Sequence, residues 1–402
     1  MRRLLLLLWL AVASAEEVVI EITGGRQAPI PIAILPFGGE PDPAEIVKQD
    51  LRRSGLFEPI GGRADQVDLE LWRQLGQDFL VEGEATRVGG RVRIRFTLYD
   101  LYGERQLAGD RFVEDANRIR QAAHRISDQI FEAILHRPGP FSAHIAFVER
   151  EGPLYRLVIA DYDGQNGRPI LISPEPILSP VFSPDGSRIA YTSLEGKIPA
   201  IYLQEIGTGK RRKIAAWAHA PAFSPDGRRL IFAQLGGEGV DLYLYDLLTG
   251  GRERLTDHVA LDTEPSFSPD GKSVVFTSDR GGSPQLYRLD LESREISRLT
   301  FSGRANTAAR FLPSGEGLIV LQSGEGGDRL VLFDRKTGRF TPLTQGPGDD
   351  GAAVAPGGDL LLYTVEVGGK PQLAIVSVNG RVQEVLPSEH PRAMPAWSPV
   401  PP

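Results

Sequence analysis

A pentapeptide that recurs at a nearly constant interval is the feature that most restricts the fold of this chain. Clear copies read Phe-Ser-Pro-Asp-Gly, two weaker copies keep its outline, and a truncated copy stands near the end of the sequence. The copies begin at Phe182, Phe223, Phe267, Phe311, Val354 and Trp397. Successive copies are 41, 44, 44, 43 and 43 residues apart. A repeat of this length, with strand-like content, is typical of a β-propeller in which each repeat forms one blade.

Each repeat unit has the same internal order. After the copy at Phe267, apolar or alternating runs follow at Ser273–Thr277, Gln285–Asp290 and Ile296–Leu299, separated by turns rich in Gly and Asp. With the strand that ends in the pentapeptide, each unit contains four strands. In the pentapeptide, Pro presets φ, Asp favours the next position, and Gly accepts the left-handed conformation that closes a hairpin. The alternative, a ring of calcium-binding Asp residues, is not needed to explain the motif.

The strand count indicates how the ring closes. Three strands at Ser142–Val148, Tyr155–Ala160 and Pro169–Ile172 have no pentapeptide strand before them, whereas Pro395–Ser398 has no strands after it. Pairing the last strand with the first three completes a sixth blade and removes an unpaired edge. We therefore predict a six-bladed propeller over residues 138–402, closed by its own carboxy-terminal strand.

The segment 16–137 lacks the repeat and mixes helix and strand patterns. Apolar residues from Ile119 to Ile134 are spaced by three or four positions, which predicts one helix face. The other expected elements are strands at 18–22 and 31–37, a helix at 44–53, a short helix at 67–75, and a hairpin formed by 79–87 and 91–99. The predicted fold class is therefore mostly β, a six-bladed β-propeller preceded by a small α/β domain.

The first fifteen residues have the pattern of an export signal. Arg2 and Arg3 precede the short apolar run Leu4–Val12, and Ala13–Ala15 provides small residues for cleavage. Nine apolar residues are about half of what a membrane-spanning helix needs. We expect a cleaved signal peptide at residues 1–15 and an exported mature chain that does not span a membrane.

Several kinds of chemistry lack the residues they would need. The chain has no Cys, which excludes disulfides and thiolate sites. It has no G-x-S-x-G sequence for a serine hydrolase, and its histidines lack zinc-site spacing. A formal net charge of −7 argues against a broad nucleic-acid-binding face. We expect no enzyme activity and no cofactor. The sequence does not decide whether a structural calcium ion occupies the propeller channel.

Together these features resemble the TolB family, periplasmic proteins of the Tol–Pal envelope system of Gram-negative bacteria. The segments that carry the resemblance are the signal peptide, Pro31–Phe37, Ser173–Pro176, the repeated pentapeptide, Thr263–Phe267, Thr277–Gly281 and Pro395–Pro399. The resemblance implies a non-enzymatic, monomeric periplasmic scaffold that supports outer-membrane integrity and invagination during cell division. It also implies two partners, the peptidoglycan-associated lipoprotein Pal at the propeller and TolA at the mature amino terminus.

The resemblance further implies which residues contact these partners. His219, Thr263 and Glu264, in loops that lead into innermost strands, match Pal-contact positions, although each could equally be an ordinary loop residue. The stretch after the signal peptide resembles the TolA-binding segment, and its alternation also permits a plain edge strand. That stretch consists of Glu16, Glu17, Val18, Val19, Ile20, Glu21 and Ile22.

A second class of function remains open from the sequence. Some propellers are hydrolases or lactonases that hold a metal in the central channel, and others belong to peptidases. A peptidase needs a catalytic domain with a nucleophile elbow, which the amino-terminal segment does not supply. A channel metal would need Asp, Glu or His from innermost strands, and Val181-Phe182, Ala222-Phe223 and Ser266-Phe267 are apolar or small. The scaffold is therefore the leading hypothesis.

Overall fold

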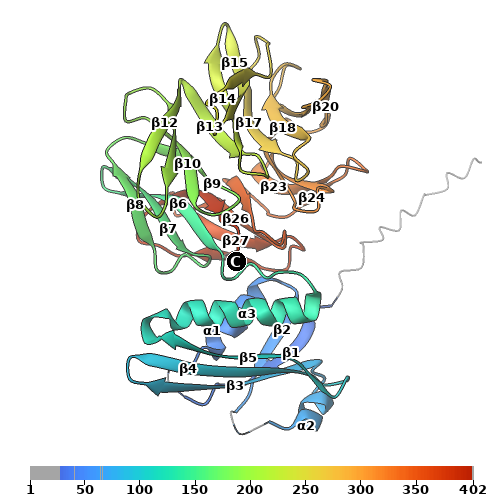
Figure 1. Ribbon diagram of the computed structural model, residues 1–402. Coiled ribbons are helices and arrows are strands. Elements are labelled where there is room, and N and C mark those ends of the chain that lie inside the picture. Colours follow the sequence, from blue (N-terminus) through green and yellow to red (C-terminus); the bar gives the residue numbers. More distant parts are fainter. Residues whose placement is uncertain (1–27, 40, 64, 66, 401–402) are drawn as a thin grey trace, which may run out of the picture.

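A computed structural model describes residues 28–400, apart from residues 40, 64 and 66. Figure 1 shows a propeller standing on a smaller domain in which two long helices lie between a sheet and the propeller. The fold class predicted from the sequence, a six-bladed β-propeller preceded by a small α/β domain, is confirmed.

The amino-terminal domain is a five-stranded sheet with two helices on the face toward the propeller and one short helix on the other face. Its strand order is β2-β1-β3-β4-β5, in which β1 runs parallel to β2 and β3 and the other pairs are antiparallel. The elements are β1 (Ile30–Ile34), α1 (Ala44–Arg53), β2 (Phe57–Gly61), α2 (Leu69–Gln74), β3 (Phe79–Val88), β4 (Arg91–Asp100), β5 (Arg105–Asp115), a 3-10 turn (Ala116–Arg118) and α3 (Ile119–Leu135). The apolar faces of α1 and α3 pack on the sheet, as the spacing of their apolar residues predicts.

Two strands of this domain were missed by the sequence analysis. The long edge strand β5 carries many charged side chains and is mostly exposed, so it has no clear alternation. The short strand β2 contains Pro59 and lies at the opposite edge. Both positions tolerate weak strand patterns because an edge strand needs only one hydrogen-bonded neighbour.

The propeller consists of six four-stranded antiparallel sheets within the described residues. Five blades are continuous in sequence, and each runs from its innermost strand outward. They are β9 (Ile177–Phe182), β10 (Arg188–Ser193), β11 (Ala200–Glu205) and β12 (Arg211–Ala216); β13 (Ala218–Phe223), β14 (Arg229–Gly236), β15 (Gly239–Asp246) and β16 (Arg252–Arg254); β17 (Asp262–Phe267), β18 (Ser273–Ser278), β19 (Gln285–Asp290) and β20 (Ile296–Arg298); β21 (Ala305–Phe311), β22 (Gly317–Gly324), β23 (Gly327–Asp334) and β24 (Phe340–Pro342); and β25 (Asp350–Val354), β26 (Leu360–Val367), β27 (Lys370–Ser377) and β28 (Gln383–Leu386).

The sixth blade joins the end of the chain to the start of the propeller. Its strands are β29 (Arg392–Trp397), β6 (His144–Glu151), β7 (Leu154–Asp161) and β8 (Arg168–Ser173), in that order. Trp397 pairs with Ile145, and its indole stacks on Tyr162 with ring centroids 6.3 Å apart. The predicted closure by the carboxy-terminal strand is therefore present.

The pentapeptide turns have the conformation that their residues predict. Gly186, Gly227 and Gly271 have φ between 67° and 69°, a region that glycine enters without steric cost. In the second turn, the Ser224 hydroxyl donates to Asp226 at 2.5 Å, and this hydrogen bond lowers the pKa of that carboxyl group. The Asp side chains of these turns thus have a structural role.

One hydrophobic core continues from the amino-terminal domain into the propeller. It joins side chains of α1 and α3 to Phe141, Tyr162 and Trp397. Polar contacts surround it: Arg53 donates to Glu384 at 2.7 and 2.8 Å, and the Asn379 amide donates to the Gly55 carbonyl at 2.9 Å. We call this side of the propeller the interdomain end. Because adjacent strands alternate in direction, the loops that lead into the innermost strands lie at the opposite side, which we call the open end.

Candidate protein-binding end of the propeller

Every innermost strand is bulged near the open end. In β13, for example, His219 pairs with Ala233 and Ala222 with Ile231, so two residues of β13 face one residue of β14. The same register shift occurs in β9, β17, β21, β25 and β29. A bulge of this kind bends the strand and redirects side chains, which makes it a common device beside functional sites.

The first bulged residue always has a positive φ. The six residues are Ser179, Ala220, Glu264, Ala308, Gly351 and Met394, with φ between 41° and 56°. Five of the six are not glycine, and the left-handed conformation costs such residues about 1 kcal/mol or more. The repetition in all six blades shows that the propeller geometry imposes this conformation. The period of the sequence predicts the strands but gives no sign of the bulges.

Glu264 links two neighbouring blades through its bulge. Its Oε2 accepts hydrogen bonds from the backbone N–H of Ala308 and from the Thr277 hydroxyl, both at 2.9 Å. Ala308 is the bulged residue of the next blade, and its N–H has no ladder partner at that position. Glu264 therefore satisfies a backbone donor that the bulge leaves free.

His219 at the start of β13 and Thr263 at the start of β17 meet between a different pair of neighbouring blades. The His219 Nε2 lies 3.0 Å from the Thr263 hydroxyl oxygen. Burial lowers the pKa of His219, and the negative charge of Glu264 offsets part of this effect. A neutral imidazole is thus favoured near pH 7. The structure brings together the three residues that the sequence analysis singled out at the propeller.

This group lacks the arrangement of a nucleophilic triad. Such a triad needs the carboxylate to orient the imidazole while the imidazole activates the hydroxyl. Here the carboxylate of Glu264 accepts from Thr277 and Ala308 instead. The arrangement of His219, Thr263 and Glu264 fits hydrogen bonding to a partner better than acyl transfer.

Exposed apolar side chains lie in the neighbouring loops of the open end. Trp217 is 51% exposed, Val259 66%, Leu261 53% and Phe301 74%. They belong to the loops that lead into three consecutive innermost strands, β13, β17 and β21. Apolar side chains around a few polar groups are typical of a protein-binding surface. The sequence analysis singled out none of these four side chains, because a single apolar residue in a loop has no periodic pattern.

The channel wall is less apolar than the sequence analysis inferred. Arg310, on β21, is half-buried, and burial lowers its pKa while the negative charge of Glu264 opposes that shift. Its guanidinium donates to the Ala309 carbonyl at 2.9 Å. The three strand segments chosen from the sequence did not include this position, which directly precedes a weak copy of the pentapeptide. The positive charge of this guanidinium disfavours the binding of a cation beside it in the channel.

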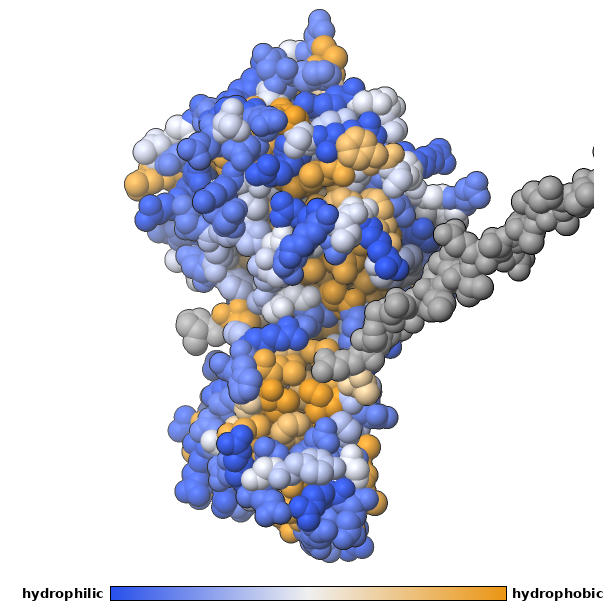
Figure 2. Space-filling model, turned by 90° about the vertical axis from the view of Figure 1, so that its right-hand side faces the viewer, coloured by the Kyte–Doolittle hydropathy of each residue, from blue (hydrophilic) through white to orange (hydrophobic). Residues whose placement is uncertain are grey.

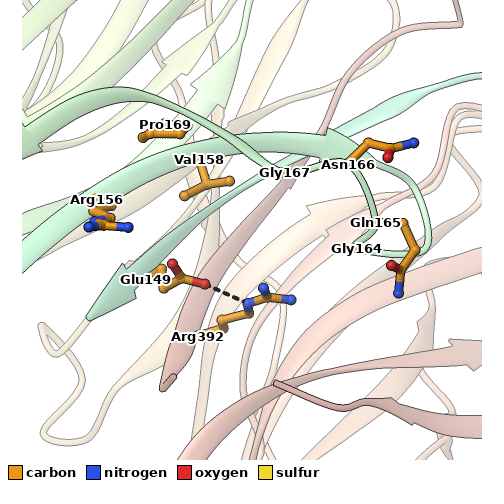
Figure 3. Close-up of a pocket in the computed structure, with 9 residues that line it drawn as sticks. All are labelled: Glu149, Arg156, Val158, Gly164, Gln165, Asn166, Gly167, Pro169 and Arg392. Carbon is orange, nitrogen blue, oxygen red and sulfur yellow. Dashed lines mark hydrogen bonds and ion pairs between the residues drawn. The ribbon is translucent and has the colours of Figure 1, made fainter. Parts of the chain in front are cut away.

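The sixth blade contains a separate polar pocket of about 290 Å³, lined by residues of all four of its strands. Figure 3 shows Glu149 and Arg392 pointing toward each other across it, and the Arg392 Nε donates to Glu149 Oε2 at 2.9 Å. Gln165 and Asn166 line the pocket from the turn after β7. Because Arg392 is paired with Glu149, and Arg156, the third charged residue of the lining, is paired with Glu151, we assign this pocket a structural role in holding β29 against β6.

Two predictions concern residues for which the structure gives no information. The signal peptide at 1–15 and the expected TolA-binding residues 16–22 lie outside the described residues. Across residues 28–400, apart from the three gaps, no helix is both long and apolar enough to cross a membrane.

Comparisons with known proteins match both parts of the chain. A family described as the TolB beta propeller domain matches residues 131–401, and one described as the TolB amino-terminal domain matches residues 18–107. The Tol-Pal system protein TolB of Nitrosomonas europaea is 41% identical over 222 residues, and that of Nitrosococcus oceani is 39% identical over 236 residues. These stretches cover 52% and 54% of both chains, so the chain spans about half the length of the curated relatives it matches.

A solved structure extends the similarity to nearly the whole chain. The crystal structure of TolB from Acinetobacter baumannii superimposes with a TM-score of 0.86 and 36% sequence identity. The superposition covers 93% of this chain and 97% of that chain. The order of the two domains and the six-bladed ring agree with this similarity. The chain therefore belongs to the TolB family.

Proposed function

We propose that this protein is a non-enzymatic periplasmic adaptor of the Tol–Pal system, exported by a cleaved signal peptide. In this role the open end of the propeller binds the lipoprotein Pal, and residues 16–22 bind TolA. The adaptor supports outer-membrane integrity and the invagination of the envelope at division. The proposal requires no catalytic step, no cofactor and no self-association.

The observation that carries the Pal proposal is the surface at the open end. His219 and Thr263 form one hydrogen-bonded pair, and four exposed apolar side chains lie in the neighbouring loops. A rigid ring holds all of these loops, so a partner could bind without a large ordering cost. Trp217 and Phe301 have the size and exposure expected of side chains that dominate protein interfaces.

Calorimetry with purified Pal tests the proposed surface. We expect saturable binding, a loss of at least about tenfold for His219→Ala combined with Thr263→Ala, and a similar loss for Trp217→Ala or Phe301→Ala. Leu248→Ala is the matched control, because Leu248 is 94% exposed but lies in the turn between β15 and β16, away from the open end. Equal affinity for all variants, or no binding at tens of micromolar, would contradict the proposal.

The TolA proposal is tested by removing residues 16–22 from the mature chain. Their alternating sequence could add a strand to a sheet edge of the partner. We expect the deletion to abolish capture of TolA while Pal binding and the melting temperature stay unchanged. If TolA is still captured, the segment is not the binding site, and the Pal result remains valid because it rests on other residues.

A further inference from the structure

A buried group of polar side chains lies where α3 meets the propeller. It contains His124 from α3, Asp161 at the end of β7 and Asp163 in the turn that follows. One ligand atom from each of these three residues lies within 4.8 Å of the others. His124 is 1% exposed, and Asp161 and Asp163 are each 6% exposed. Among the described residues, no other group of this kind could hold a metal ion.

Asp50, on α1, fixes the tautomer and orientation of His124. Its carboxylate accepts from the Tyr162 hydroxyl at 2.5 Å and the Ser127 hydroxyl at 2.7 Å, and it lies 2.8 Å from His124 Nδ1. An ionised carboxylate can only accept, so the hydrogen of the imidazole is on Nδ1. A histidine that donates from one ring nitrogen to a carboxylate while the other nitrogen is free has the arrangement of a metal ligand with its supporting carboxylate.

The second ring nitrogen of His124 has no partner. Its Nε2 is buried and makes no hydrogen bond, although the ring stands within reach of two carboxylates. A buried polar atom without a partner costs about 1–3 kcal/mol, so native proteins rarely keep one without a reason. A metal ion bound to Nε2 in place of a proton would give this nitrogen a partner.

The two carboxylates also have oxygen atoms to offer. Asp161 uses Oδ2 to accept from Asn166 at 2.7 Å and from Gln121 at 3.4 Å, and its Oδ1 accepts no side-chain hydrogen bond. Asp163 directs Oδ2 toward Arg120 and Arg53, whereas its Oδ1 accepts only the backbone N–H of Gln165 at 3.2 Å. Oδ1 of each carboxylate thus accepts no hydrogen bond from a side chain.

The charge of the group favours a divalent cation. The surrounding charged side chains are the carboxylates of Asp50, Asp161, Asp163 and Glu384 and the guanidinium groups of Arg53 and Arg120. Four negative and two positive charges leave a net charge of −2 around the neutral imidazole that a bound metal ion would require. Buried charge of one sign is costly unless it is compensated. A single divalent ion would compensate it.

We propose that His124, Asp161 and Asp163 form a binding site for a divalent transition-metal ion, of which Zn²⁺ is the fitting example. One imidazole nitrogen and two carboxylate oxygens suit zinc, which binds such ligands at about 2.0–2.2 Å. Calcium and magnesium prefer all-oxygen sites, so the histidine selects against them. Because His124 belongs to the amino-terminal domain and both Asp residues belong to the propeller, the ion would fasten the two domains together.

The direct test is titration of the mature chain with Zn²⁺ after treatment with a chelating resin. We expect one equivalent to bind with a dissociation constant of about 1 μM or below, together with a higher melting temperature. His124→Gln and Asp161→Asn should each weaken binding at least tenfold and abolish the temperature shift. His390→Gln is the matched control and should bind within about twofold of the unaltered chain.

Two further measurements distinguish a bound metal ion from an ordered water at this position. Substitution with Co²⁺ should give a visible absorption band of a low-coordinate site that His124→Gln lacks. Crystals grown with Zn²⁺ should show an anomalous peak between α3 and the turn after β7. If His124→Gln does not fold, Asp161→Asn and the anomalous peak decide the question. Three results would overturn the proposal: Zn²⁺ binding weaker than about 100 μM, variants that bind Zn²⁺ as tightly as the unaltered chain, or only an ordered water at this position in the crystals.

Discussion

The two ends of the propeller use polar side chains in opposite ways. At the interdomain end, Asp50 is fully buried and accepts from three side chains, and aromatic rings enclose the network. At the open end, His219 and Thr263 bond to each other beside exposed apolar side chains. Figure 2 shows hydrophobic side chains gathered on the amino-terminal domain close under the propeller, where the two domains join. One scaffold thus supports a closed interface on one side and an accessible surface on the other.

The comparison teaches that polar groups stabilise the fold at one end and are available to a partner at the other. Changes at the interdomain end should therefore lower stability more than equivalent changes at the open end. A pair of tryptophans tests this difference directly, and the other substitutions test the effect of burial behind it.

Two tryptophans give the largest expected contrast. Trp397, which is 9% exposed and belongs to the core shared by both domains, should lose about 3–5 kcal/mol of unfolding free energy on replacement by Ala. Trp217→Ala should lose less than about 1 kcal/mol, because that side chain is half exposed. Urea denaturation followed by circular dichroism measures both. Equal losses would show that the open end is as tightly packed as the interdomain end.

A substitution in the Asp50 network should cause the second-largest loss of unfolding free energy. Asp50→Asn places an amide N–H₂ among three buried donors, which we expect to cost about 2–4 kcal/mol. Asp185→Asn is the control, because Asp185 also accepts a serine hydroxyl but lies in an exposed turn. Its loss should stay below about 1 kcal/mol. A similar loss for both variants in urea denaturation would mean that burial of the network contributes little.

A pH experiment should show a smaller effect at Asp128, whose pKa is raised, and none at Asp226, whose pKa is lowered. Burial raises the pKa of Asp128 to about 6, against hydrogen bonds from the backbone N–H groups of Phe141 and Ser142. A raised carboxyl pKa means that folding takes up a proton, so the contribution to stability grows as pH falls through 6 and is lost above it. The stability difference between the unaltered chain and Asp128→Asn should grow between pH 7 and pH 5, by at most about 2 kcal/mol.

Asp226 is the control for that experiment, because its pKa is shifted in the opposite direction. Its pKa is lowered, so its contribution is present above the unfolded pKa and is lost only at more acidic pH. The difference between the unaltered chain and Asp226→Asn should therefore stay constant between pH 7 and pH 5. A constant difference for Asp128→Asn as well would contradict the role of burial at Asp128.

Glu264→Gln should have the smallest effect on stability. The amide oxygen of Gln can still accept from the Ala308 N–H, so we expect a loss below about 1 kcal/mol. Removal of the charge should lower the pKa of His219 further, because Glu264 raises that pKa at present. NMR titration of His219 measures this shift. An unchanged or higher pKa would mean that the two side chains do not interact electrostatically.

Much of the architecture could be predicted from the sequence because it depends on local and repeated signals. The pentapeptide fixes the turns through the properties of Pro, Asp and Gly, and its spacing fixes the number of blades. The helix at Ala44–Arg53 was predicted at the bounds observed, since its apolar spacing and the following Gly55 are both local. The exposed strand β5 had no such pattern and was missed.

The sites were less predictable because they depend on residues far apart in the chain. His219 and Thr263 were chosen by family resemblance, and the structure shows that they form a hydrogen bond across blades, which no spacing rule gives. Asp50 and Tyr162 are 112 positions apart and meet only after the two domains pack together. The six bulges also had no sequence signal, because five of the six left-handed residues are not glycine.

The closing strand has a consequence for how the molecule matures. Five blades arise from uninterrupted stretches of the polypeptide, whereas the sixth requires Trp397 to reach Ile145, a neighbour made much earlier in synthesis. Such distant pairing is slow, and until it occurs β6 presents a bare edge to other chains. The ring must therefore stay open until its last strand emerges, and interrupted products should be especially prone to aggregate or to be degraded.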